Sequence, residues 1–166
     1  MTETFKLKPV REGAISEAIE KAKRYRLLNE PRGAESICRD ILRIQPDHHL
    51  ALITLILALT DQFATGQGSP GTACVRDYVA KLPDEYERLY YQGLVCERQA
   101  RAMLTRGLAG GFAYDGLRNA MDLYEQAEKI RPPENDDAIL RWNSCVRTIR
   151  RADLRPRIEE EELPLE

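Results

Sequence analysis

Histidine and the large aromatic residues are scarce in this sequence. It has two histidines, three phenylalanines and one tryptophan, which leaves little material for a histidine-based metal or catalytic centre. The two histidines are adjacent, and neighbouring residues on a helix point about 100° apart, whereas paired histidine ligands stand four residues apart on one face. We therefore expect His48 and His49 to be solvated residues in the first turn of a helix, and we expect no metal and no cofactor.

A long apolar segment is also missing. The longest, residues 50–59, is interrupted only by Thr54, and as a helix it would rise about 15 Å, half of what a bilayer requires. The N-terminal residues contain no apolar core of a signal peptide. The four cysteines include no C-x-x-C pair, and without a secretory signal they are typical of reduced, buried thiols; they are Cys38, Cys74, Cys96 and Cys145. We expect a cytoplasmic protein with no membrane partner.

Neither sign of charge dominates. The chain has 25 Lys and Arg against 27 Asp and Glu, a formal net charge of −2, which argues against a nucleic-acid-binding protein that relies on bulk positive charge. Basic residues gather between Lys21 and Arg43, but acidic residues are interspersed with them, so they predict a solvated face. The carboxylates stand mostly where helices are predicted to start and complement the helix dipole there. We expect no nucleic-acid partner and no enzymatic activity.

Helical periodicity dominates the chain, and strand patterns are nearly absent. We predict an all-α fold with helices at residues 13–29, 31–44, 47–63, 70–81, 84–107, 114–130 and 135–151. Pro31 and Pro70 suit first-turn positions, and Asp47 and Asp84 are placed to cap the helices that follow them. The predicted organisation is an N-terminal extension over 1–12, a helical repeat domain over 13–151 and an acidic, flexible tail over 152–166. The helix containing 50–59 is apolar on nearly all sides and belongs in the middle of the fold.

Three segments share one pattern: a small residue, apolar residues four and seven positions later, and a proline five positions after that. They are Ala34-x3-Cys38-x2-Ile41-x4-Pro46, Gly71-x3-Val75-x2-Tyr78-x4-Pro83 and Ala120-x3-Tyr124-x2-Ala127-x4-Pro132. Such a stripe lets a neighbouring helix approach closely, and the proline stops the helix. The pattern resembles the second helix of the tetratricopeptide repeat (TPR), a helix–turn–helix unit of about 34 residues. Residues 90–94, ahead of the third stripe, are the most family-like stretch of a first helix.

The resemblance covers residues 15–151 and implies antiparallel helix pairs stacked as a right-handed superhelix, with residues 136–151 as a capping helix. Proteins of this family bind peptides or other proteins, so the first expectation is a protein-interaction module, an adaptor or scaffold. A secretion-type chaperone of the small three-repeat class is one alternative. A nucleotide-binding protein is another, because residues 66–71 satisfy G-x-G-x-x-G. Without a strand before the glycines, however, we interpret this segment as an expanded turn between helices.

The resemblance places the partner-binding groove on the first helices of the repeats. Seven residues are predicted to line it: Ile19, Lys23, Ile53, Leu57, Tyr90, Tyr91 and Leu94. The rim is predicted at Glu20, Lys23, Glu97 and Arg98. An apolar and aromatic floor suits an amphipathic helix or an extended apolar segment of a partner. Three alternatives stay open: residues 163–165 or the long helix after Cys96 cover the groove, the seven residues only complete the core, or a homodimer buries the uncapped N-terminal end of the array.

Overall fold

The structure of the chain is a computed structural model that describes residues 4–66 and 68–158. Every regular element within these ranges is helical, which confirms the all-α prediction. The chain divides into two compact units, Met1–Leu82 and Pro83–Glu166, and this boundary falls between the second and third predicted repeats. Among the described residues, no helix is both long enough and apolar enough to cross a bilayer.

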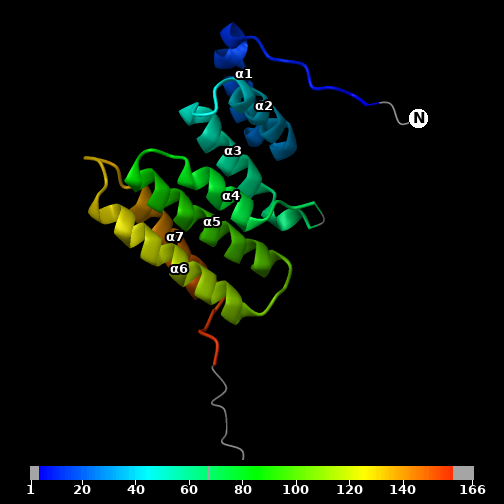
Figure 1. The fold of residues 1–166 in the computed structure, drawn as a ribbon. Coiled ribbons are helices and arrows are strands. Elements are labelled where there is room, and N and C mark those ends of the chain that lie inside the picture. Colours follow the sequence, from blue (N-terminus) through cyan, green and yellow to red (C-terminus); the bar gives the residue numbers. More distant parts are fainter. Residues whose placement is uncertain (1–3, 67, 159–166) are drawn as a thin grey trace, which may run out of the picture. The chain divides into compact units, whose positions relative to one another are not determined.

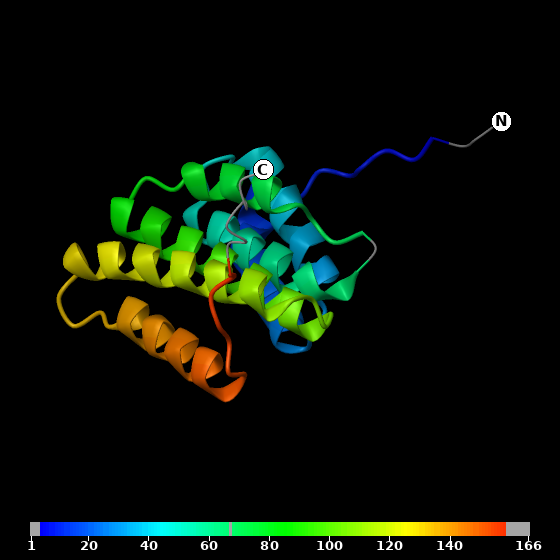
Figure 2. The same ribbon diagram turned by 90° about the horizontal axis from the view of Figure 1, so that it is seen from below.

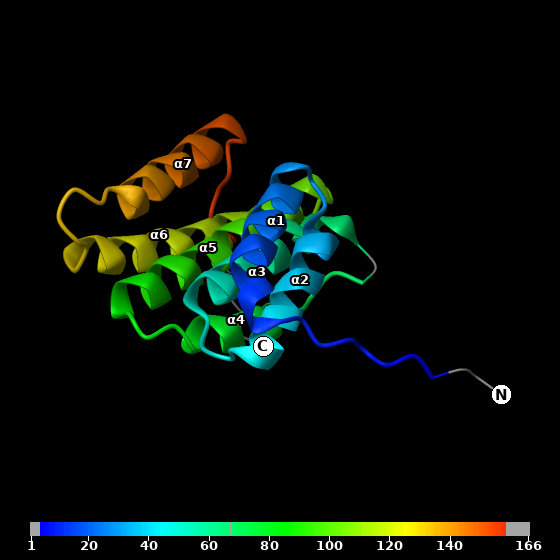
Figure 3. The same ribbon diagram turned by 90° about the horizontal axis from the view of Figure 1, so that it is seen from above.

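The described residues of the first unit form four α-helices. They are α1 (Ile15–Leu27), α2 (Pro31–Ile44), α3 (His49–Asp61) and α4 (Thr72–Ala80), with short 3-10 turns at Glu12–Ala14 and Phe63–Thr65. Each helix packs against the next along the chain, and α1 also contacts α3 (Figures 1 and 3). Arg26 on α1 and Asp61 on α3 form an ion pair with an Nε–Oδ2 distance of 2.7 Å. Helix α3 therefore touches all three other α-helices of its unit, the central place that its apolar composition predicted.

The core of the first unit contains the first repeat stripe. Ala34, Cys38 and Ile41 on α2 have no exposed surface, as their spacing predicted. Helix α3 contributes eight buried residues from nearly all of its sides. Apolar burial on this scale is the main stabilising term for a unit of this size.

The second repeat stripe was predicted only in part. Gly71 is exposed and Tyr78 is half-buried, whereas Val75 is buried as expected. The reason is that α4 begins at Thr72, so Gly71 precedes the helix and cannot lie on its face. The side chains that α4 turns toward the core are Val75 and Val79.

Up to residue 158, the second unit forms three long helices: α5 (Glu85–Thr105), α6 (Gly110–Lys129) and α7 (Asp137–Arg151). Helix α6 packs against both α5 and α7, and α6 and α7 form an antiparallel pair joined by a short turn (Figure 2). The third repeat stripe, Ala120, Tyr124 and Ala127, is buried. Trp142 on α7 packs against this core, in agreement with its expected place in the capping helix.

Gly93 on α5, within residues 90–94, occupies a position where only a small residue fits. A Cβ atom at this position would lie 2.7 Å from Cε1 of Tyr124, much closer than carbon atoms pack. The absence of a side chain at Gly93 thus lets the ring of the third stripe lie directly against the α5 backbone.

Helix α6 begins at Gly110, earlier than the predicted start at residue 114. Gly110 and Gly111 lie between the predicted helices at 84–107 and 114–130, but the segment after α7 contacts them in the first turn of α6. A Cβ atom at Gly111 would lie 2.5 Å from Cγ of Arg157, and Leu154 is only 8% exposed. Leu154 and Arg157 of the predicted tail therefore pack against α6, while 159–166 lie outside the described residues.

Of the residues predicted at helix ends, some were right and others were wrong. Asp84 caps α5 as expected, because its side chain accepts a hydrogen bond from the backbone N–H of Tyr86. At α3 the capping residue is His48 rather than Asp47. Pro70 lies before α4 and not in its first turn. Helix α1 ends at Leu27, before the predicted residue 29, since Asn29 adopts a left-handed backbone conformation with φ 59°.

Candidate functional site

The seven residues predicted to line the groove are divided between the two units. Ile19, Lys23, Ile53 and Leu57 belong to the first, and Tyr90, Tyr91 and Leu94 belong to the second. The residues of each unit are therefore described separately. A continuous groove built from both units stays a prediction.

The two predicted groove residues on α1, Ile19 and Lys23, differ in their exposure. Ile19 is 4% exposed and belongs to the core, the arrangement expected if it completes the packing. Lys23 is half-buried, and its Nζ lies 2.7 Å from Oε1 of Glu20, one turn earlier on the same helix. Of these two, only Lys23 offers a polar group at the surface of α1.

Helix α3 has one line of apolar side chains that is less buried than the rest of the helix. Between residues 50 and 60 every position is buried except Leu50, Ile53 and Leu57. Leu50 is 44% exposed, and the other two are half-buried. Their spacing of three and four residues puts them on one face of the helix. We call these three residues the α3 stripe.

In the second unit the predicted tyrosines form a ring cluster. The ring centroids of Tyr90 and Tyr91 are 5.0 Å apart in an edge-to-face arrangement, and Tyr90 also lies 6.1 Å from Tyr86 and 5.9 Å from Tyr124. Burial, reinforced by the neighbouring Tyr90, raises the pKa of Tyr91. Leu94 is 1% exposed. These residues therefore stabilise the packing of the second unit.

Glu97, predicted at the rim of the groove, is fully buried instead. Its Oε1 accepts a hydrogen bond from Nε of Arg101 at 2.9 Å and lies 3.6 Å from Nη1 of Arg141. Its Oε2 accepts a hydrogen bond from the hydroxyl of Tyr124 at 2.6 Å. Burial, together with the charge of Glu97, raises the pKa of that tyrosine, so the hydroxyl remains a donor. The rim assignment was wrong because α6 and α7 cover this face of α5.

The arginines extend this buried network onto α7. Arg101 donates hydrogen bonds to Thr148 Oγ1 at 2.7 Å and to Ser144 Oγ at 2.9 Å. Burial by itself would lower the pKa of Arg141, but a hydrogen bond to Tyr90 and the attraction of the nearby carboxylate outweigh it and raise the pKa. The network joins all three helices of the second unit and is a structural element rather than a binding site.

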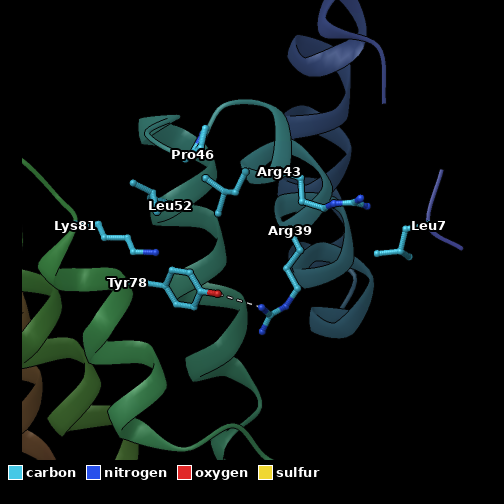
Figure 4. Close-up of a pocket in the computed structure, with 8 residues that line it drawn as sticks. Leu7, Arg39, Arg43, Pro46, Leu52, Tyr78 and Lys81 are labelled. Carbon is cyan, nitrogen blue, oxygen red and sulfur yellow. Dashed lines mark hydrogen bonds between the residues drawn. The ribbon is translucent and has the colours of Figure 1, made fainter. Parts of the chain in front are cut away.

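A pocket that sequence analysis missed lies in the first unit, with a volume of about 380 Å³ (Figure 4). Helices α2, α3 and α4 and the N-terminal segment contribute its lining: Leu7, Arg39, Leu42, Arg43, Pro46, Leu52, Tyr78 and Lys81. The arginines of α2 were interpreted as part of a solvated face. Four segments far apart in sequence build the pocket, so no local pattern could have indicated it.

Tyr78 contacts two of the cations that line this pocket. Its hydroxyl accepts a hydrogen bond from Nη1 of Arg39 at 3.0 Å (Figure 4), and the Lys81 Nζ lies 4.9 Å from its ring centroid. Arg39 also pairs with Glu35, one turn earlier on α2, at 2.9 Å. The pocket thus combines the cations Arg39, Arg43 and Lys81 with apolar side chains in one lining.

The cysteines and histidines make no reactive centre in the described part of the chain. All four cysteines are free, and Cys74 is exposed rather than buried as predicted. Burial raises the pKa of the Cys38 and Cys145 thiols to about 12, so both are neutral at physiological pH. His48 accepts a hydrogen bond from the N–H of Ala51 at 3.1 Å. No group of three or more His, Cys, Asp or Glu side chains that could hold a metal ion occurs among the residues described.

The glycine-rich segment at 66–71 lies between two helical elements. A 3-10 turn, Phe63–Thr65, precedes it, and α4 follows it. Gly66 and Gly68 have φ angles of 83° and 80°, which only glycine adopts at little cost. The strand that a dinucleotide site requires before its glycines is replaced here by helix. This geometry favours the expanded turn over the nucleotide-binding alternative.

No family model, curated protein or solved structure matches this chain. Its description therefore rests on its own fold, an all-α chain of two compact units, and on the two surfaces of the first unit described above.

Proposed function

We propose that the chain is a protein-interaction module of the tetratricopeptide type, an adaptor or scaffold without catalysis of its own. It binds an amphipathic segment of a partner protein along the α3 stripe. The observation that carries the proposal is the stripe itself. On a helix whose other side chains are largely buried, Leu50, Ile53 and Leu57 remain at the surface in one apolar line, and apolar residues at this spacing are how helices recognise amphipathic partners.

The arrangement of the helices supports the repeat interpretation. The first and third stripes are buried, consecutive helices pack in pairs, and the boundary between the units at Leu82 falls between predicted repeats. A cytoplasmic location is part of the proposal. Four cysteines that form no disulfide support it, because secreted domains of this size commonly pair their cysteines.

A peptide-display selection against the full chain tests the proposal. Selected sequences are expected to be amphipathic, and their affinity is then measured by fluorescence polarisation. Leu50→Asp and Leu57→Asp should each weaken binding by about 1–3 kcal/mol, because each puts a charge into an apolar contact. Leu50→Asp is the safer variant for folding, since Leu50 is 44% exposed.

Leu140→Asp is the matched control, because Leu140 is a 64% exposed leucine on α7 outside the predicted groove. Circular dichroism should show unchanged helicity for all three variants. Selected peptides that bind the α3 variants and the control equally would exclude the stripe as the site. A selection that yields no specific peptide would count against the function as a whole.

A further inference from the structure

The pocket between α2, α3 and α4 has a composition suited to a second kind of ligand. It shares no residue with the α3 stripe, so the inference does not rest on the proposed function. We propose that this pocket binds a short acidic peptide segment of a partner protein. The carboxylates of that segment pair with Arg43 and Lys81, and an apolar side chain of the same segment packs against Leu42 and Pro46.

The charges of the pocket call for an anionic ligand. Three cations line it, and none of the lining residues that the structure describes is acidic. Glu35 already neutralises Arg39 at 2.9 Å. Within the described part of the chain, neither Arg43 nor Lys81 has a carboxylate at ion-pair distance, and Lys81 instead faces the ring of Tyr78. Two positive charges on α2 and α4 are therefore left for a ligand to neutralise.

The apolar residues of the pocket favour a peptide over a phosphate or a nucleic acid. Half of the lining is apolar: Leu7, Leu42, Pro46 and Leu52. A bare phosphate would gain nothing from these side chains, whereas a peptide with a Leu or Phe beside its acids would bury them. A nucleic-acid base would need a free aromatic face, but Tyr78 already engages Arg39 through its hydroxyl and Lys81 through its ring. A volume of about 380 Å³ is at the small end for ligand pockets and accommodates a few side chains rather than a helix.

Fluorescence polarisation with the full chain and three labelled hexapeptides tests this inference. The acidic probe is Glu-Asp-Leu-Phe-Asp-Glu. The neutral probe is Gln-Asn-Leu-Phe-Asn-Gln, and the third, Glu-Asp-Ser-Ser-Asp-Glu, keeps the charges without the apolar pair. Saturable binding is expected for the first probe, weakening as salt rises, and each of the other two should bind at least about tenfold more weakly.

Charge reversal locates the site. Arg43→Glu and Lys81→Glu should each weaken binding of the acidic probe about tenfold or more. Arg76→Glu, the same change at an exposed position of α4 outside the pocket, should leave the affinity unchanged. Peptides selected on the α3 stripe should not displace the acidic probe, so that failure of this inference and failure of the α3 stripe are separate results.

Three outcomes would overturn the proposal. The first is equal binding of the acidic probe to Arg43→Glu, Lys81→Glu and the unmodified chain. The second is displacement of the probe by inorganic phosphate or by a single-stranded oligonucleotide at lower concentration than by unlabelled peptide, which would assign the pocket to phosphate groups. The third is binding that appears only when Glu159, Glu160, Glu161 and Glu162 are all replaced by Gln, which would assign the pocket to the chain's own acidic residues.

Discussion

Replacing the buried Glu97 by Gln tests whether its charge stabilises the second unit. Glu97 has no exposed surface, and its two carboxylate oxygens take short hydrogen bonds from Arg101 at 2.9 Å and from Tyr124 at 2.6 Å. Gln keeps the shape of the side chain and one accepting oxygen but removes the charge. The substitution therefore isolates the electrostatic part of the network.

The expected cost is about 2 kcal/mol. A hydrogen bond to a charged group contributes about 1.5–3 kcal/mol net and a neutral one about 0.5–1.5 kcal/mol, so each of the two bonds loses about 1 kcal/mol. Removing one partner of a fully buried ion pair costs more, about 3–5 kcal/mol. Here Arg101 and Arg141 are 36% and 35% exposed in their side chains, so water can take up their charges and the cost stays lower.

Urea denaturation followed by tryptophan fluorescence measures this cost. Trp142 is the single tryptophan of the chain and packs against the core of the second unit, so its signal reports that unit. Asp122→Asn is the matched control. Asp122 pairs with Arg118 at 2.9 Å, but both side chains are well exposed, and loss of such a surface pair costs at most about 1 kcal/mol.

A double-mutant cycle gives the decisive comparison. Tyr124→Phe removes the hydroxyl that Glu97 accepts and should cost about 1.5–3 kcal/mol alone. Combined with Glu97→Gln, the total should be smaller than the sum of the two, because both changes remove the same charged hydrogen bond. A Glu97→Gln variant within 0.5 kcal/mol of the unmodified chain, on the order of an exposed substitution, would refute the reasoning.

Two further predictions concern the cores of the two units. The pKa of the Cys38 and Cys145 thiols is raised from 9.0 to about 12 in the folded chain, so the unfolded chain loses these protons first as the pH rises. The free energy of unfolding should therefore fall between about pH 9 and pH 12, by about 1.4 kcal/mol per pH unit for each thiol. Urea titrations at several alkaline pH values measure this slope, and Cys38→Ala should make it shallower in the first unit; an unchanged slope would contradict the assignment. Gly93→Ala should destabilise the second unit by about 1–3 kcal/mol, because its Cβ would lie 2.7 Å from Tyr124. Gly13→Ala, where nothing lies within 4 Å of a Cβ, is the thermal-melting control, and equal melting temperatures for both variants would exclude the steric argument.

Most of the helix pattern could be predicted because its signals are local. Helix α2 was predicted at the residues it occupies, 31–44, since Pro31 starts it and its apolar residues recur at helical spacing. The start of α6, by contrast, was predicted wrongly. Gly110 and Gly111 look like turn residues, yet they begin α6 because a later segment, including Arg157, packs across them.

Of the two candidate surfaces, one could be predicted from the sequence and the other could not. Ile53 and Leu57 were predicted as surface residues on one face of a helix, and the structure leaves both half-buried there. The pocket around Tyr78 could not be predicted, because its lining comes from α2, α3, α4 and the N-terminal segment. Its charge pattern exists only once these four segments are packed.

The sequence by itself determined that the chain is all-α, how its helices are ordered and which positions on each helix are apolar, because the 3.6-residue period and the proline and capping signals act over a few residues. The tertiary structure alone decided which faces are covered. Glu97 on α5 is charged and yet buried, because Tyr124 and two arginines contact its carboxylate. Leu50 on α3 is apolar and yet exposed, because no described helix of the first unit covers it. Burial is set by neighbours distant in sequence, and only the folded chain brings them together.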